Sequence, residues 1–233
     1  MKKLIITCEH GGNKLPEEYK NLIPQNVLHS HRAWDPGAIE IFKSFCNLPH
    51  YFCLVSETSR LLVELNRSEN NRNLFSKYSK AIPPNEKKII IEKYYYPFRS
   101  IVLEKAKAAI ELGFTVIHLS IHTFTPILNG ITRNADIGIL YDPKNRKEKI
   151  FSALFKEDLA KDSNLKVRFN YPYLGISDGH TSYLRKKLGH KKYLGIELEV
   201  NQKFYFDKNN IFDQLINIIK DAFETSFLRF QPI

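Results

Sequence analysis

The sequence predicts an α/β fold whose central sheet is mixed and largely parallel and is covered by helices on both faces. Short runs of β-branched and other apolar residues recur along the chain, and each run stops at a polar cluster. Stretches with helical periodicity separate these runs. Strands that alternate with helices build three-layer sheets, which carry functional residues at the carboxyl ends of their strands. The polar clusters that follow the strands are therefore the candidate site.

Four segments are expected to be strands, namely 2–8 (KKLIITC), 114–121 (FTVIHLSI), 135–141 (ADIGILY) and 193–200 (YLGIELEV). Helical patterns cover 86–110, 147–162 and 211–228, the last of which is expected to close the domain. Gly113 ends the first helical pattern, and Pro97 inside it is expected to kink the helix or to divide it into two.

Length and composition are typical of one globular domain spanning residues 1–233. With 43% hydrophobic and 26% charged residues, the chain is neither disordered nor a coiled coil. Its 35 Lys and Arg against 25 Asp and Glu give a net charge of +10, which raises nucleic acid as an alternative partner. The basic residues are dispersed, and neither an aromatic RNA-binding motif nor a zinc-finger spacing is present, so this alternative is disfavoured.

Cysteine usage and the N-terminus indicate a cytoplasmic protein. Three cysteines (Cys8, Cys46 and Cys53) are too few for a disulfide framework or a four-thiolate zinc site. The apolar run Leu4–Cys8 is too short for a secretory signal, and no stretch approaches the length of a membrane span.

Two histidines are candidate metal ligands. His10 follows the first strand and precedes Gly11-Gly12, where backbone can approach a ligand closely, although a structural histidine is the simpler alternative. His118 and His122 lie four residues apart, and on a strand this spacing separates them by roughly 13 Å. They therefore cannot share one ion, so His118 is expected to be a hydrogen-bonded interior residue and His122, at the strand end, the ligand.

Three carboxylates accompany them. Asp35 precedes Pro36-Gly37, where ordinary turn chemistry is an alternative explanation. Glu197 and Glu199 alternate with apolar residues and therefore share one face of a strand. A solvated edge strand would explain both, but buried carboxylates are otherwise paired, metal-bound or catalytic. Glu199 is nearer the strand exit and is the better catalytic candidate.

Arg60, Asn66 and Arg67 lie near another apolar run and are suited to an anionic substrate. Guanidinium groups bind carboxylates through two parallel hydrogen bonds, and an amide adds a neutral donor. Surface arginines are common, so the motif gains weight only beside a metal and a catalytic glutamate.

Taken together, several motifs resemble the N-formylglutamate amidohydrolase family over residues 4–206. They are Cys8–Asn13, His31–Ala38, Ser59-Arg60 with Asn66-Arg67, His122–Pro126, Ala135–Asp142, Asp178–Thr181 and Glu197–Gln202. The resemblance implies a zinc-dependent amidohydrolase acting on linear amides, with a fold related to zinc carboxypeptidases and aspartoacylase. Its expected substrate is a small anionic N-acyl amino acid, N-formyl-L-glutamate first.

The resemblance also implies site roles. His10 and His122 match the metal-binding histidines, and Glu199 matches the general base. Asn13 stands where related peptidases place a metal-binding glutamate, so Asp35 is expected to be the third ligand, with another residue left open. The resemblance also implies that Arg60 stabilises the oxyanion. Four residues are expected to bind the substrate, namely Asn66, Arg67, Arg133 and His180. Three more are expected to support the metal ligands from behind, namely Glu9, Asn13 and Glu197.

Three positions depart from the family pattern. Glu64 replaces an aspartate, Thr123 replaces a serine, and Asn201 stands where an arginine often follows the catalytic glutamate. The third change removes a positive charge near the substrate, which leaves other N-acyl amino acids and the carboxy-terminal residue of a short peptide open as substrates. Manganese, iron or cobalt stay open beside zinc. The sequence does not indicate an oligomeric state.

Overall fold

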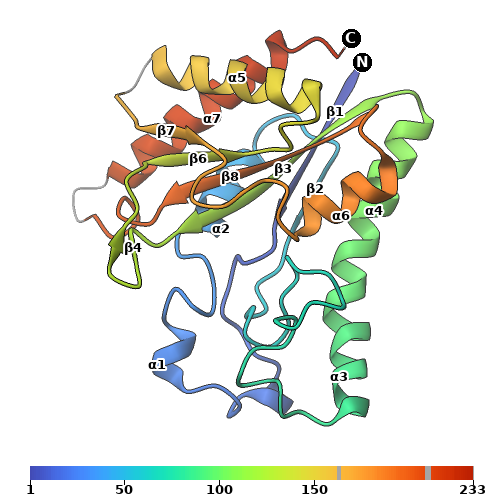
Figure 1. Cartoon of the computed structure of the whole chain (residues 1–233), viewed down its shortest axis with the longest axis vertical. Coiled ribbons are helices and arrows are strands. Elements are labelled where there is room, and N and C mark those ends of the chain that lie inside the picture. The colour runs from blue at the N-terminus through green and yellow to red at the C-terminus, as the bar shows by residue number, and fades with distance from the viewer. Residues whose placement is uncertain (162–163, 208–210, 233) are drawn as a thin grey trace.

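A computed structural model describes residues 1–161, 164–207 and 211–232. Its centre is a six-stranded sheet in the order β2-β1-β3-β8-β6-β7 (Figure 1). The strands are β1 (Lys2–Cys8), β2 (Phe52–Val55), β3 (Thr115–Phe124), β6 (Ile137–Leu140), β7 (Val167–Phe169) and β8 (Tyr193–Asn201). Strands β2, β1, β3 and β8 are mutually parallel, whereas β6 is antiparallel to β8 and parallel to β7. The predicted mixed, largely parallel sheet is confirmed.

Helices cover both faces of the sheet, as predicted. One face packs against α2 (Ala38–Phe45), α5 (Arg146–Lys161) and α7 (Ile211–Arg229), and the other against α4 (Tyr96–Glu111) and α6 (His180–Leu188) (Figure 1). Residue 162, the predicted end of the helix that became α5, lies outside the described residues.

Alternation of side chains along the central strands decides where polar groups gather. In β3, Ile117, Leu119 and Ile121 enter the core under α2, α5 and α7, so His118, Ser120 and His122 must face the opposite side. In β8, the same alternation sends Glu197 and Glu199 to that opposite side. One face of the central strands therefore becomes polar toward their carboxyl ends.

A π-helical turn interrupts the long helical stretch just before Pro97, where a kink or a division was predicted. α3 (Pro84–Ile90) continues into a π-helical turn, η2 (Ile91–Tyr95), and then into α4, where Pro97 occupies the first turn. Proline has no N–H to donate, and the Tyr96 N–H instead bonds the carbonyl of Ile91, five residues earlier. The wider turn absorbs the proline without ending the helix.

Shorter elements were not predicted. They are η1 (Glu17–Tyr19), α1 (Gln25–Leu28), the β4 (Ile127–Leu128) and β5 (Ile131–Thr132) hairpin, and also α2, α6, β2 and β7. Most are too short for a periodic pattern to form, and β2 and β7 contain only four and three residues. Within the described part of the chain, no helix has the length and apolar character needed to cross a bilayer.

Candidate active site

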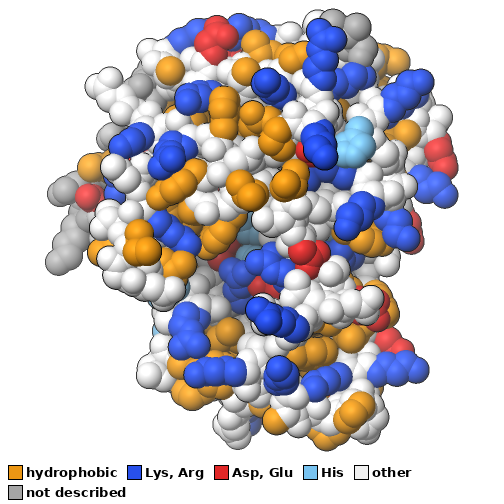
Figure 2. Space-filling view, in the orientation of Figure 1, with side chains coloured by type: hydrophobic (Ala, Val, Ile, Leu, Met, Phe, Trp, Pro, Cys, Tyr) orange, Lys and Arg blue, Asp and Glu red, His pale blue; other side chains and the backbone are white. Residues whose placement is uncertain are grey.

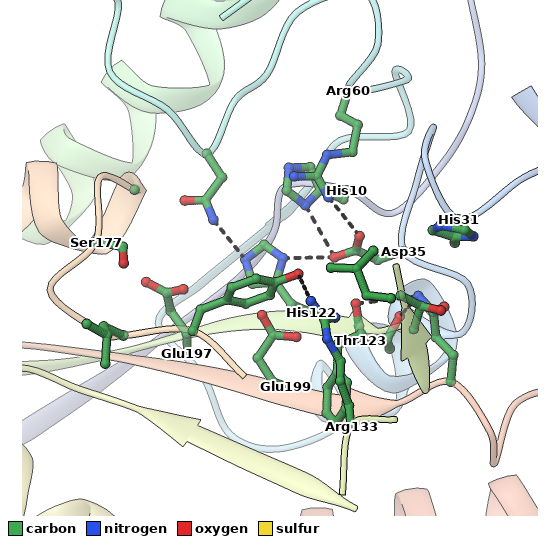
Figure 3. Close-up of a pocket in the computed structure, with 18 of the residues that line it drawn as sticks. His10, His31, Asp35, Arg60, His122, Thr123, Arg133, Ser177, Glu197 and Glu199 are labelled. Carbon is green, nitrogen blue, oxygen red and sulfur yellow. Dashed lines mark hydrogen bonds and ion pairs between the residues drawn. The ribbon is translucent and has the colours of Figure 1, made fainter. Parts of the chain in front are cut away.

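A cavity of about 200 Å³ opens where β1, β3 and β8 end. Figure 3 shows His10, Asp35 and His122 pointing toward one another, with Glu197 and Glu199 beside them. The cavity brings together nine of the predicted site residues: His10, Asp35, Arg60, Asn66, Arg67, His122, Arg133, Glu197 and Glu199.

His10, Asp35 and His122 form a buried cluster that fits a metal ion. The two Nδ1 atoms lie 3.2 Å (His10) and 3.0 Å (His122) from the same carboxylate oxygen, Oδ2 of Asp35. Tetrahedral zinc bonds of about 2.0–2.1 Å place neighbouring ligand atoms roughly 3.3 Å apart, close to these separations. Within the described residues, this is the one group of His, Cys, Asp and Glu whose ligand atoms converge so closely.

The outer nitrogen of each imidazole is held so that Nδ1 keeps its lone pair. His10 Nε2 bonds the Glu64 carboxylate, which accepts hydrogen only. The Ser120 hydroxyl donates its hydrogen to Glu9 Oε2 (2.7 Å), so it accepts from His122 Nε2 (2.9 Å). In a neutral imidazole, Nδ1 therefore presents its lone pair to the Asp35 carboxylate, an arrangement that a cation between them would satisfy. In a protonated imidazole without the cation, the Nδ1–H donates to Asp35 instead.

Arg60 links two of these carboxylates. Its Nη1 donates to Asp35 Oδ1 (3.1 Å) and its Nε to Glu64 Oε2 (2.7 Å). Burial alone would raise the pKa of Asp35, but the His10 charge, hydrogen bonds from both imidazoles and the Arg60 charge lower it well below its usual range. Burial would likewise raise the pKa of Glu64, and Arg60 and His10 lower it. Both groups are therefore carboxylates at neutral pH.

Glu9 lies behind His122 and is fully buried. It accepts hydrogen bonds from Thr7, Ser120 and His180, and its Oε2 is 3.4 Å from His122 Nε2. Burial would raise the pKa of Glu9, but the hydrogen bonds to His122 and His180 lower it well below its usual range. Glu9 thus lies on the outer side of the His122 imidazole and does not line the cavity.

Backbone contacts bring these distant segments to one place. The Asp35 N–H donates to the His10 carbonyl (3.0 Å), and the Thr123 hydroxyl donates to the Pro36 carbonyl (2.8 Å). Thr123 therefore makes a hydroxyl contact of the kind that a serine provides. A Cβ on Gly12 would lie 2.6 Å from the Glu57 carbonyl oxygen, so only glycine fits at this position of the chain after β1.

Glu199 lies across from the cluster and has an unused oxygen. It is 4% exposed, and its Oε2 has no hydrogen-bond partner. The pKa of Glu199 is raised to about 8, above all by burial; the charges of Asp35 and Glu197 add to the rise, and those of His122 and Arg60 oppose it. Glu197 is engaged by the Thr181 hydroxyl. A carboxyl with a raised pKa and a free oxygen in a polar cavity is suited to proton transfer.

Arg67 and Arg133 bring positive charge to the cavity without carboxylate partners. Arg67 Nη1 donates to the carbonyls of Asn66 (2.8 Å) and Asp178 (2.7 Å). The Arg133 guanidinium lies against the Tyr173 ring (5.0 Å), its Nη2 donates to the Tyr173 hydroxyl (3.0 Å), and its buried Nη1 has no partner. No carboxylate of the described residues is within 4 Å of either guanidinium.

Two expected positions are corrected. His180 does not line the cavity: its imidazole is fully buried and bonds Glu9 (2.9 Å), because α6 begins there and directs the ring under the sheet face. Asn13 does not line the cavity either, and its amide donates to the Leu28 carbonyl (2.8 Å). His118 has its expected interior place, bonded to Thr7 and Tyr193.

Asn201 also lies outside the cavity lining, since its amide binds the Ala135 carbonyl (2.8 Å). Asn201 carries no positive charge where an arginine is often found. Arg133, two residues before Ala135, does line the cavity and brings a positive charge to it.

Three contributors were not assigned from the sequence: Glu64 and Ser120, which hold the two imidazoles, and Tyr173, which holds Arg133. A carboxylate two residues before Asn66 and a serine two residues before His122 were the available signals. Tyr173 had none.

Comparison with known proteins agrees with this architecture. The sequence profile of N-formylglutamate amidohydrolases matches residues 2–206. No curated protein matches the sequence. A gene product of Agrobacterium tumefaciens of known structure is 25% identical, covers 96% of this chain and 91% of its own, and has a TM-score of 0.77. The structure of an N-formylglutamate amidohydrolase from Ralstonia eutropha JMP134 shares the fold, with a TM-score of 0.75 and 15% identity over 98% of this chain and 94% of its own. Because the family profile includes every residue that lines the cavity, the chain belongs to the N-formylglutamate amidohydrolase family.

Proposed function

We propose that the protein hydrolyses the amide bond of an N-acyl amino acid. The leading candidate substrate is N-formyl-L-glutamate, which would give formate and L-glutamate. His10, Asp35 and His122 would hold a divalent metal ion, with zinc as the first candidate. One observation carries the proposal: Glu199, with its unused buried oxygen, is the register neighbour of His122 and faces the same cavity.

Glu199 is the proposed general base and acid. It takes a proton from the attacking water while the water oxygen bonds to the acyl carbon. It then returns the proton to the amide nitrogen as the C–N bond breaks, which releases the amine. A divalent ion, when bound, supplies Lewis-acid polarisation of the carbonyl and a lowered pKa of water.

Arg60 is proposed to stabilise the negative charge that develops on the carbonyl oxygen. Three of its five N–H groups are engaged by Asp35 and Glu64, which leaves two for the oxyanion. Its ion pairs hold the guanidinium in place before substrate arrives, and such preorganised donors are effective because they need no rearrangement.

The two arginines without carboxylate partners support an acidic substrate. Arg67, with Asn66, would bind the α-carboxylate, and Arg133 would bind a carboxylate on the substrate side chain. Each guanidinium forms charge-assisted, paired hydrogen bonds with a carboxylate. The combination favours N-acylated glutamate or aspartate over neutral amino acids.

The proposal is tested by measuring the metal content and the hydrolytic activity of the same protein preparation. We expect about one divalent ion per chain by elemental analysis, the typical catalytic-zinc stoichiometry, and release of L-glutamate from N-formyl-L-glutamate. Chelation should abolish the release, and added zinc should restore it. His10→Ala and His122→Ala should each lower the metal content. Unchanged stoichiometry in either variant would show that the ligand set is wrong.

Arg133 is tested by selectivity. Arg133→Leu should reduce the preference for N-formyl-L-glutamate over N-formyl-L-glutamine by about 10- to 100-fold in kcat/KM, because a charged hydrogen bond is lost for one substrate only. An unchanged ratio would remove Arg133 from side-chain recognition.

A bulkier acyl group is a second candidate, favoured by apolar side chains at the mouth. Leu128 and Leu174 line the cavity, and Leu174 is 57% exposed. Figure 2 shows apolar side chains gathered on the face that carries the opening. A panel of N-formyl, N-acetyl and longer N-acyl glutamates, together with short peptides, would separate these substrates by the rate of amine release.

A further inference from the structure

The segment that carries Asn66 and Arg67 has little regular structure of its own. Residues 59–83 form turns with neither helix nor strand, yet they contribute Arg60, Asn66 and Arg67 to the cavity. Without a ladder of backbone hydrogen bonds, such a segment keeps one conformation only if other groups hold it.

One buried cation holds this segment on both sides of Asn66. Arg99 of α4 is 3% exposed, and its Nη1 donates to the carbonyls of Leu65 (2.8 Å) and Arg67 (3.3 Å). The Tyr95 hydroxyl donates to the same Arg67 carbonyl (2.8 Å). The Arg99 guanidinium also stacks on the rings of Tyr95 (5.0 Å) and Tyr183 (4.3 Å), which fixes its plane.

The π turn is what brings Tyr95 to this position. Ile90 and Tyr95 are five residues apart and both enter the same apolar cluster. In an α-helix, a separation of five residues would turn their side chains about 140° apart. The wider turn over Ile91–Tyr95 reduces this offset, and Arg99 then follows Tyr95 by four residues on the same helix face.

Binding two backbone carbonyls does not by itself require a charged side chain, because a neutral donor could do the same. No carboxylate of the described residues lies within 4 Å of it, and its Nη2 has no partner. Burial lowers the pKa of Arg99, as expected for a cation removed from water. Arg67 Nη1 donates to the Asn66 carbonyl, which lies in the sequence between the two carbonyls that Arg99 binds, so the two guanidinium groups together hold three consecutive carbonyls. An anion bound at Asn66 and Arg67 would stabilise both.

We propose that Arg99, with the Tyr95 hydroxyl, is a positioning residue for substrate: it holds the Leu65–Arg67 backbone so that Asn66 and Arg67 bind the α-carboxylate, and its charge strengthens that binding. The inference rests on the proposed function. It predicts an effect on substrate binding rather than on the chemical step, because Arg99 does not line the cavity that contains Glu199.

Steady-state kinetics of Arg99→Met test the proposal. KM for N-formyl-L-glutamate should rise by about 10- to 100-fold, the range for losing a hydrogen bond to a charged group, while kcat changes by less than about threefold. Arg99→Lys keeps the charge but loses the paired hydrogen-bond geometry, so its KM should lie between those of Arg99→Met and the wild type. Arg72→Met, at an exposed arginine of the same segment, is the matched control and should leave KM unchanged.

A double-mutant cycle tests the route. If Arg99 acts through Arg67, Arg99→Met should have little further effect on KM in an Arg67→Ala background. Additive effects would overturn the proposal, as would an unchanged KM or a fall in kcat alone in folded Arg99→Met. If Arg99→Met does not fold, Arg99→Lys and Tyr95→Phe replace it, and an unchanged KM in both would overturn the proposal.

Calorimetric titration with L-glutamate separates this inference from the proposed reaction. Wild-type protein that hydrolyses no N-acyl amino acid, yet binds L-glutamate more tightly than Arg99→Met does, would refute the reaction and support the positioning role. Equal affinity in the two proteins would refute the positioning role, whatever the reaction.

Discussion

Both imidazoles of the candidate metal site are held from behind by a buried acid. Glu64 holds His10 directly, and Glu9 holds His122 through Ser120. Such partners orient a metal-binding imidazole and increase its basicity, so their loss weakens metal binding without removing a ligand.

Glu9→Gln should therefore lower metal affinity by about 10- to 100-fold, measured by competition with a chelator of known affinity. Asn13→Ala is the matched control, because the Asn13 amide binds the Leu28 carbonyl away from the ligands and its loss should leave affinity unchanged. Equal affinities for Glu9→Gln and wild type would exclude a role for Glu9 in holding His122.

Glu199→Gln should keep the metal and the fold but lower kcat by about 10²- to 10⁴-fold, the usual contribution of a general acid or base. Single-turnover rates and elemental analysis of the same sample measure both effects. Glu197→Gln should lose less, because Glu197 is engaged by Thr181. A wild-type rate in Glu199→Gln would remove it from the mechanism.

At the level of elements, β6 and the segment after β7 build one wall of the cavity. Gly138 of β6 is paired in register with Glu199, and a Cβ there would lie 1.9 Å from the Tyr171 carbonyl oxygen. The chain of 171–174 therefore crosses directly over Gly138 and places Tyr173 and Leu174 at the cavity. A glycine within a strand often marks such a close approach of another backbone.

Gly138→Ala should displace this wall. We expect a loss of about 1–3 kcal/mol in the free energy of unfolding, typical of overpacking, together with a raised KM. Gly113→Ala is the control: its φ of +91° makes alanine unfavourable, but nothing lies within 4 Å of its Cβ. It should lose stability while KM stays constant. Denaturant titration and steady-state kinetics measure the two effects, and a normal KM in Gly138→Ala would contradict this account of the wall.

At the level of the whole molecule, positive charge is not gathered into one patch on the face that Figure 2 draws. On the face drawn in Figure 2, Lys and Arg are dispersed among acidic and neutral side chains. The net charge of +10 thus has no focus on this face, apart from the arginines of the cavity. The absence of a nucleic-acid partner stays a prediction.

The buried site couples stability to pH and metal. The pKa of Glu199 is raised to about 8 by burial first, so its ionisation opposes folding increasingly between its unfolded value near 4.5 and pH 8. Burial lowers the pKa of His122, but hydrogen bonds and charge from Asp35 and Glu9 raise it well above its usual value. Stability from protonated His122 is complete below pH 6.5 and is lost as the pH rises toward the folded pKa.

Metal-free protein should therefore melt at a lower temperature at pH 8.5 than at pH 5.5. Added zinc should raise the melting temperature more at pH 8.5, because the ion requires neutral imidazoles and favours ionised Glu199. Thermal scans with chelator and with zinc measure both effects, and Glu199→Gln should flatten part of the metal-free pH dependence. A metal-free protein that is more stable at pH 8.5 would contradict the two pKa shifts.

Much of the site could be predicted along single strands. The placement of His10 and His122 at strand ends, the separation of His118 from His122, and the shared face of Glu197 and Glu199 all follow from the two-residue period of a strand, which is a local property of the chain. The interruption of the long helix just before Pro97 is equally local in origin.

The pairings between segments depended on the tertiary structure. Glu64 on His10, Ser120 between Glu9 and His122, the burial of His180, and the turn of Asn13 toward Leu28 each join groups brought together by packing. A hydrogen bond requires donor and acceptor within about 3 Å. No period or propensity of the chain sets a distance between residues dozens of positions apart; only the packed sheet and its loops set it.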